Sequence, residues 1–238
     1  MLFQLKSSRR KRALCLREDP ALIMHSIFHH RSQVSDLSSD DWLNTFAEGG
    51  FSAVIFDCDG TLVESSRAHL SCMQAAAEEQ GHKMSKDWYS VRTGLDRHSL
   101  FREFGESRDA AFDVERACQA SIERYGDFAR LVRPIPETIK FAKALRRQNV
   151  PLAVATNAER PVAELSLSTA HARHLFDLIV SLTDNIPPKP SPLMFELAAE
   201  KLDVPRAKAL IVEDSPEGVR AAKETCMSVI QIVHEHSM

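Results

Sequence analysis

The chain has 238 residues, of which 44% are hydrophobic and 26% charged, a size and composition that suit one α/β domain or a core with a modest second domain. The formal net charge of −3 and the lack of an apolar run of about 18 residues favour neither nucleic acid nor a membrane as a partner. The five cysteines are scattered and form no C-x-x-C pair, so we expect a reducing compartment rather than a disulfide framework or a structural zinc site.

Residues 1–50 are predicted to be an N-terminal extension, partly disordered or folded into short helices. Six Lys or Arg and two acidic residues lie in the first nineteen positions, without the long apolar stretch of a secretory signal. This start leaves open an organelle transit segment in residues 1–20, a solvated basic tail, or an over-extended start. We expect a short helix over 21–30, a loop over 31–41, and a second short helix that ends at Gly49 and Gly50.

The first strand-like run, residues 52–56, is followed by a long interval of a different kind. Residues 67–132 show mostly helical patterns, such as "RAHLSCMQAAAEEQG" and "VERACQASIERYGDFARL", and no comparable apolar strand. We therefore predict an all-helical domain over 67–132, inserted into a core domain made of residues 51–66 and 133–238.

Later in the chain, short apolar runs alternate with helical patterns. Fully apolar strands that alternate with helices indicate a parallel sheet covered by helices on both faces. The expected strands are 152–156, 176–182, 209–212 and 227–233, and the expected helices are 136–148, 158–170, 192–202 and 216–225.

Polar side chains follow the predicted strands at the point where each strand ends. Ligands of open parallel sheets bind at the carboxyl ends of the strands. Clustered carboxylates need a cation, and Mg²⁺ commonly takes one or two carboxylates plus a phosphate, while backbone N–H groups near Gly60 suit phosphate oxygens. The pattern predicts a site for a phosphate dianion beside Mg²⁺. The residues concerned are Asp57, Asp59, Gly60, Thr156, Asn157, Lys189, Glu213 and Asp214.

Four short motifs carry a resemblance to a known family: "DCDGT", the Thr156 of "ATN", the Lys189 of "KPSP", and "EDSPEG". In this order, and with room for an inserted domain, they resemble the haloacid dehalogenase superfamily over residues 51–233. The helical insertion resembles the small cap of the subgroup that holds β-phosphoglucomutase and sugar-phosphate phosphatases. The resemblance implies a Rossmann-like, doubly wound parallel sheet with an all-helical cap domain.

The resemblance also implies roles for these residues. Asp57 is expected to be the nucleophile that forms an aspartyl-phosphate. Asp59 is expected to protonate the leaving oxygen and then deprotonate water, for which its surroundings should raise its pKa. Lys189 is expected to offset charge during catalysis. Mg²⁺ is expected on Asp57, the Asp59 carbonyl and Asp214, with Glu213 as a further ligand or a neighbour of the ligands; phosphate is expected on Gly60, Thr156, Asn157 and Lys189.

Two residues of the predicted cap are expected to meet the substrate. Arg97, in "GLDRHSL", resembles a residue that faces the distal groups of the substrate, a role that suits a guanidinium. His69 resembles a histidine that contacts Asp59. Two positions depart from the mutases, which carry lysines there: Glu159 after the second motif and Ser121 in the cap. Both departures favour a phosphatase.

A further departure lies after the last predicted helix, where Cys226 replaces a glycine of the family. A glycine there would adopt the left-handed conformation that ends many helices, so this turn is expected to differ. The difference is not expected to reach the chemistry.

The predicted function is therefore a Mg²⁺-dependent phosphatase that hydrolyses a small phosphorylated metabolite, such as a sugar phosphate, through an aspartyl-phosphate. The alternatives are a sugar phosphomutase and a receiver-like phosphoacceptor domain, although in receivers the acidic pair comes first in the chain. We expect a cytoplasmic monomer or weak dimer that binds neither nucleic acid nor membrane, or an organellar protein if residues 1–20 are a transit segment.

Overall fold

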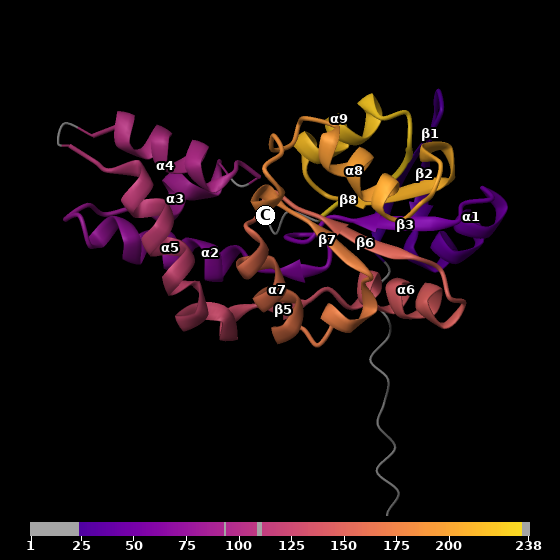
Figure 1. The fold of residues 1–238 in the computed structure, drawn as a ribbon, viewed down its shortest axis with the longest axis horizontal. Helices are drawn as coiled ribbons and strands as arrows, with labels where there is room; N and C mark the ends of the chain where they lie inside the picture. The colour runs from indigo at the N-terminus through magenta and orange to yellow at the C-terminus, as the bar shows by residue number, and fades with distance from the viewer. Residues whose placement is uncertain (1–23, 93, 109–110, 235–238) are drawn as a thin grey trace, which may run out of the picture.

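The computed structural model describes residues 24–92, 94–108 and 111–234 (Figure 1). The basic segment at residues 1–20 lies outside the described residues. A central sheet with helices above and below it forms one part of the molecule, and a group of helices lies to one side of it. No helix in the described ranges is both long and apolar enough to cross a membrane.

The sheet has seven strands in the order β2-β1-β9-β8-β3-β6-β7. Five of them run parallel, with β3 between β8 and β6 near the middle. This arrangement confirms the predicted parallel sheet and places the end of β3 beside the ends of its two neighbours. The parallel strands are β3 (Ala53–Phe56), β6 (Leu152–Ala155), β7 (Leu178–Val180), β8 (Ala209–Glu213) and β9 (Ser228–Ile232).

Helices cover both faces of the parallel part of the sheet, which explains why its parallel strands are largely apolar. Val54 and Phe56 of β3 face one buried cluster, and Ile55 between them faces the other, because side chains alternate along a strand. The first cluster lies under α1 (Trp42–Glu48), α6 (Pro136–Arg147) and α7 (Arg160–Thr169). The second lies under α8 (Leu193–Lys201) and α9 (Pro216–Glu224).

The expected helix over 21–30 and loop over 31–41 are wrong. Residues His25–His30 form β1 and residues Gln33–Ser38 form β2, an antiparallel hairpin that extends the sheet beyond β9. Pairing with the free edge of β9 satisfies backbone groups that a short isolated helix would satisfy poorly. Ser26 anchors the hairpin, since its buried hydroxyl donates to the Leu37 carbonyl and accepts from Trp42 Nε1. The short helix expected over 40–50 is confirmed as α1.

The segment between the short strands β4 (Val63–Glu64) and β5 (Arg133–Pro134) forms the group of helices at the side of the sheet (Figure 1). Among its described residues it contains helices and no strand. Sequence patterns missed the shortest helix, α3. We call this segment the helical insertion; its helices are α2 (Ser66–Glu78), α3 (Lys86–Ser90), α4 (Arg97–Glu106) and α5 (Val114–Phe128).

The turn after α9 keeps the left-handed backbone although its residue is not glycine. Cys226 has φ +62° and an exposed side chain, so the expectation of a different turn is wrong. An L-residue in this conformation costs roughly 1–2 kcal/mol, because its Cβ approaches a carbonyl oxygen. The fold thus carries a local strain at the end of α9.

Cys226→Gly is expected to raise the free energy of unfolding by about 1 kcal/mol, because glycine adopts positive φ without the steric cost. The measurement is the urea midpoint followed by circular dichroism. Cys226→Ala is the matched control: it also removes the thiol but keeps a Cβ, so its midpoint is expected to stay at the wild-type value. Equal midpoints for all three proteins would contradict the account of strain.

Candidate active site

A buried lysine joins two carboxylates at the carboxyl edge of the sheet. Lys189 lies in the loop between β7 and α8, and its Nζ donates to Asp57 Oδ1 at 2.6 Å and to Glu213 Oε2 at 2.7 Å. Asp57 directly follows β3, and Glu213 is the last residue of β8. Burial lowers the pKa of Lys189, but the two carboxylates outweigh it and raise the pKa above the usual value, so the ammonium stays charged.

Glu213 is held in place by its surroundings. It is fully buried, and its Oε1 accepts from the backbone N–H groups of Asp214 and Ser215 and from the Ser215 hydroxyl. Ser215 also accepts from the Gly218 N–H and thereby begins α9. A Cβ on Gly218 would lie 2.0 Å from Glu213 Oε2, so only glycine lets α9 approach this carboxylate.

The charges at this edge do not balance without a further cation. One carboxylate oxygen from each of Asp57, Glu213 and Asp214 lies within 4.8 Å of the other two, and in the described part of the chain the ammonium that binds them is that of Lys189. Burial, with the charge of Glu213, raises the pKa of Asp57 well above its usual value, and Lys189 opposes this shift. Three carboxylates and one ammonium leave a formal charge of −2. His234 Nε2, 3.4 Å from Asp214 Oδ2, offsets part of it when protonated, and this contact raises the pKa of His234. The remaining negative charge fits a divalent ion with oxygen ligands.

Gly60 and Thr61 of the "DCDGT" motif lie against Asp214. Thr61 Oγ1 donates to Asp214 Oδ1 at 2.8 Å. Gly60 has φ +90°, and a Cβ there would lie 2.2 Å from Asp214 Oδ2. The turn after β3 therefore needs glycine both for its backbone conformation and for its close approach to the carboxylate.

Asp59 lies under the helical insertion rather than among the other carboxylates. Ser65 Oγ donates to Asp59 Oδ1 at 2.5 Å, and His69 Nε2 of α2 lies 3.1 Å from the same oxygen. Burial raises the pKa of Asp59, but the charge and hydrogen bond of His69 and the bond from Ser65 outweigh it, so the pKa is lowered. The expectation of a raised pKa is wrong for this structure: the His69 contact was expected, but its charge and hydrogen bond, together with the bond from Ser65, outweigh burial.

The residues after β6 take two different positions. Thr156 is buried, and its Oγ1 accepts from the Ala158 N–H. Asn157 binds the backbone of Lys189 with both of its polar atoms: Oδ1 accepts from the Lys189 N–H at 2.8 Å, and Nδ2 donates to its carbonyl at 3.3 Å. Asn157 therefore fixes the loop that carries the lysine.

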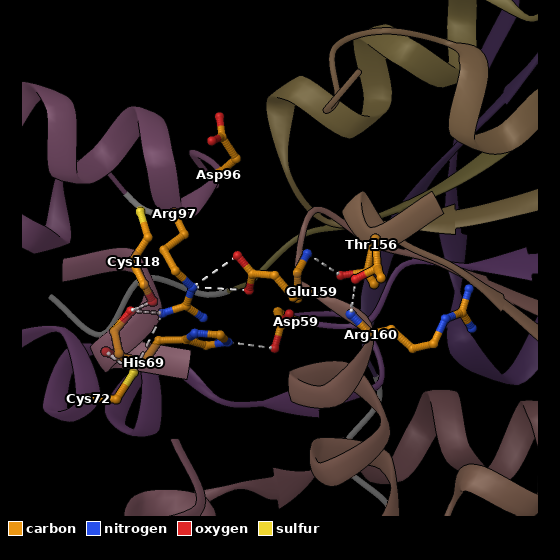
Figure 2. A network of polar contacts seen from close by, with 12 residues as sticks. Asp59, His69, Cys72, Asp96, Arg97, Cys118, Thr156, Glu159 and Arg160 are labelled. Atoms are coloured by element: carbon orange, nitrogen blue, oxygen red, sulfur yellow. Dashed lines mark hydrogen bonds and ion pairs between the residues drawn. The ribbon is translucent and has the colours of Figure 1, made fainter. Parts of the chain in front are cut away.

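Arg97, at the start of α4, lies buried between the helical insertion and the core. Its Nε donates to both carboxylate oxygens of Glu159 at 3.1 and 3.0 Å, and its Nη1 donates to Ser121 Oγ at 2.8 Å (Figure 2). Cys72 Sγ lies 3.9 Å from the same Nη1. The two positions that depart from the mutase pattern thus both contact one guanidinium.

One cavity of about 790 Å³ lies between the helical insertion and the sheet edge. It brings together all the predicted site residues except Glu213, which lies behind Lys189. Sequence reasoning missed Ser65 and Gly218, whose roles follow from the folded geometry around Asp59 and Glu213. It also missed His234, whose Nε2 lies 2.8 Å from the Gly60 carbonyl, 174 residues away in the chain. The predicted site residues that line the cavity are Asp57, Asp59, Gly60, His69, Arg97, Thr156, Asn157, Lys189 and Asp214.

Comparison with known proteins agrees with this geometry. The chain is 33% identical over 186 residues to a phosphoglycolate phosphatase of Neisseria meningitidis, covering 74% of this chain and 78% of that protein. It is 28% identical over 189 residues to a phosphorylated carbohydrates phosphatase of Thermotoga maritima, covering 76% and 85%.

Solved structures share the fold as well. The crystal structure of CbbY from Rhodobacter sphaeroides in complex with xylulose-(1,5)bisphosphate superposes with a TM-score of 0.68 and 26% identity, covering 74% of this chain and 84% of that one. The model of the family described as haloacid dehalogenase-like hydrolase matches residues 54–232. With this match over most of its length, the chain belongs to the haloacid dehalogenase-like hydrolase family.

Proposed function

We propose that this protein is a Mg²⁺-dependent phosphatase that hydrolyses a small phosphorylated metabolite, in the first place a sugar phosphate. The observation that carries the proposal is the buried contact of Lys189 with Asp57 and Glu213, beside Asp214 at the end of the parallel strands. The Lys189 ammonium orients Asp57 and opposes the rise of its pKa that burial and Glu213 cause, which favours the ionised, nucleophilic form. The names of the two phosphatase relatives support the same class of substrate.

In the proposed reaction, a carboxylate oxygen of Asp57 attacks phosphorus, and the bond from phosphorus to the ester oxygen breaks. Asp59 gives its proton to that leaving oxygen. In the second step Asp59 takes a proton from water, the water oxygen attacks phosphorus, and the bond to Asp57 breaks to release inorganic phosphate. The dianionic substrate raises the pKa of Asp59 as it binds, which offsets the lowering by His69.

The donor set fits a magnesium ion held by Asp57, Asp214 and the backbone carbonyl of Asp59. When bound, the ion supplies positive charge against the phosphate oxygens. We place Glu213 outside this set of ligands, because one of its oxygens already binds Lys189 and the other accepts three hydrogen bonds. Its role is then to hold Lys189 toward Asp57.

For the phosphate group we propose the Lys189 ammonium, the Thr156 hydroxyl and backbone N–H groups beside Gly60; Lys189, Thr156 and Gly60 line the cavity. Asn157 positions Lys189 instead of binding phosphate, since its side chain is engaged with the Lys189 backbone. The helical insertion acts as the cap that closes the cavity over the substrate, and His69 reaches Asp59 from it.

A phosphomutase is the alternative within the family, but Glu159 and Ser121 replace the lysines of the mutase pattern. The family match speaks against a receiver-like phosphoacceptor domain. We propose a reducing compartment, cytoplasmic unless residues 1–20 direct the protein to an organelle, because the described cysteines are all free thiols. A monomer or weak dimer remains our prediction for the oligomeric state.

Asp57→Asn is expected to lower kcat/KM for p-nitrophenyl phosphate on the order of 10³-fold or more, because an amide cannot serve as the nucleophile. The assay measures release of p-nitrophenol in the presence of Mg²⁺. Asp127→Asn, at an exposed position of α5, is the control for the same chemical change and is expected to keep wild-type activity. Full activity of Asp57→Asn would reject the proposed mechanism.

Chelation of divalent ions with EDTA is expected to abolish phosphate release, and added MgCl₂ is expected to restore it. Binding of the ion to the folded state also stabilises it, by about 2.7 kcal/mol when the ion is at 100 times its Kd. A rise of the melting temperature with MgCl₂ therefore gives a readout independent of catalysis. An enzyme that is equally active and equally stable without divalent ions would contradict the proposed metal site.

Gly218→Ala is expected to lower both activity and stability, because the added Cβ would lie 2.0 Å from Glu213 Oε2 and force this carboxylate away from Lys189. Breaking a buried ion pair and overpacking cost about 2–4 kcal/mol. Gly126→Ala in α5 is the control: its Cβ meets only Leu165 Cδ2 at 3.9 Å, so alanine should stabilise the helix by about 0.5–1 kcal/mol. Two variants with equal stability would refute this role of Gly218.

A further inference from the structure

Three Lys or Arg side chains line the cavity within the described ranges, and each already has a carboxylate partner. Lys189 binds Asp57 and Glu213. Arg92 donates from Nε to Glu103 at 2.9 Å and lies 4.1 Å from the ring centre of Trp88. Arg97 binds Glu159. If the proposed phosphate site uses Lys189, the two guanidinium groups that remain on the cavity wall, those of Arg92 and Arg97, are already paired with Glu103 and Glu159.

The ion pair of Arg97 and Glu159 joins the helical insertion to the core. Arg97 belongs to α4 of the helical insertion, whereas Glu159 directly precedes α7 of the core. The Arg97 side chain is 3% exposed and that of Glu159 is 20% exposed. Ser121 fixes the other edge of the guanidinium at 2.8 Å. Figure 2 shows the two side chains pointing toward each other beside His69 and Asp59.

We propose that Glu159 is a specificity-determining residue: by occupying Arg97, it prevents the cavity from binding a second anionic group. The preferred substrates are then phosphate monoesters whose remaining part is uncharged, such as hydroxylated compounds with a single phosphate. This inference rests on the proposed phosphatase function and narrows its substrate class.

The charge of the cavity wall agrees with this assignment. Acidic residues outnumber Lys and Arg among the described lining residues, since Glu64, Glu159 and Glu217 add to the aspartates of the site. A second phosphate or carboxylate on the substrate would have to displace Glu159 from Arg97. That displacement would leave a partly buried carboxylate without its partner, which is costly. Hydroxyl groups of a neutral substrate need no such displacement.

The test compares glucose 6-phosphate with glucose 1,6-bisphosphate, which differ by one phosphate. Wild-type kcat/KM is expected to favour the monophosphate. Glu159→Gln removes the charge and keeps the shape, so Arg97 becomes available to the second phosphate. Charge-assisted hydrogen bonds of a guanidinium to phosphate are strong enough to raise the ratio of kcat/KM, bisphosphate over monophosphate, about tenfold or more.

Glu217→Gln is the matched control, because it also removes a carboxylate from the cavity wall, but this carboxylate accepts a hydrogen bond from Arg220 and not from Arg97. Its ratio is expected to stay within about twofold of wild type, a smaller change than loss of a direct contact produces. The gain in Glu159→Gln is expected to disappear when Arg97→Met is added. If Glu159 only held the cap closed, Glu159→Gln would change kcat/KM for both substrates by the same factor. A ratio of kcat/KM equal to that of wild type would therefore overturn the proposal.

Binding to the inactive Asp57→Asn protein, measured by isothermal titration calorimetry with the same two compounds, separates this inference from the proposed function. If no ester is hydrolysed but Glu159→Gln still shifts binding toward the bisphosphate, the phosphatase function fails and the role of Glu159 stands. If wild type hydrolyses the esters, and the bisphosphate is preferred both in its kcat/KM and in binding to Asp57→Asn, the function stands and the role of Glu159 is rejected.

Discussion

The structure of the site depends on one constraint, the burial of a lysine among carboxylates. A charged group removed from water must find partners of opposite charge with good geometry. Lys189 finds them in Asp57 and Glu213, and neighbouring features serve these contacts. Ser215 satisfies the far oxygen of Glu213, Gly218 leaves room for it, and Asn157 holds the lysine backbone. Helix α9 and the loop after β7 are thereby fixed relative to β3.

A second buried ion pair, between Arg97 and Glu159, repeats this arrangement where the helical insertion meets the core. Residues of both pairs line the same cavity, but the two pairs affect the charge of its wall differently. At the sheet edge the acids exceed the ammonium, and this imbalance underlies the proposed binding of a cation and of phosphate. Between the insertion and the core one guanidinium meets one carboxylate, so no net charge remains for a ligand. The cavity wall therefore carries net negative charge at the sheet edge and a neutral ion pair where the insertion meets the core.

The sequence allowed the parallel sheet and the order of its motifs to be predicted, because strands such as β3 and β8 are apolar on both faces and are followed directly by Asp57 or Asp214. It did not allow the β1–β2 hairpin to be predicted, since its pairing depends on the edge of β9, about 200 residues away. The partner of Arg97 was missed for the same reason, since Glu159 lies 62 residues further along the chain. The lowered pKa of Asp59 was missed although its contacts are local, because the balance between burial and the bonds from His69 and Ser65 depends on the folded site.

The N-terminal hairpin has a consequence for the behaviour of the protein in concentrated solution. A strand at the border of a sheet has unpaired backbone N–H and C=O groups, which can pair with a strand of another molecule and lead to aggregation. Here the hairpin covers β9, and the new border strand β2 has the sequence QVSDLS, with four of its six residues exposed and a single acidic side chain. The border of the sheet therefore moves from the apolar strand β9 to a mostly polar strand, on which Val34 is an exposed apolar side chain, and the hairpin takes up the backbone groups of β9 that a second chain would otherwise meet.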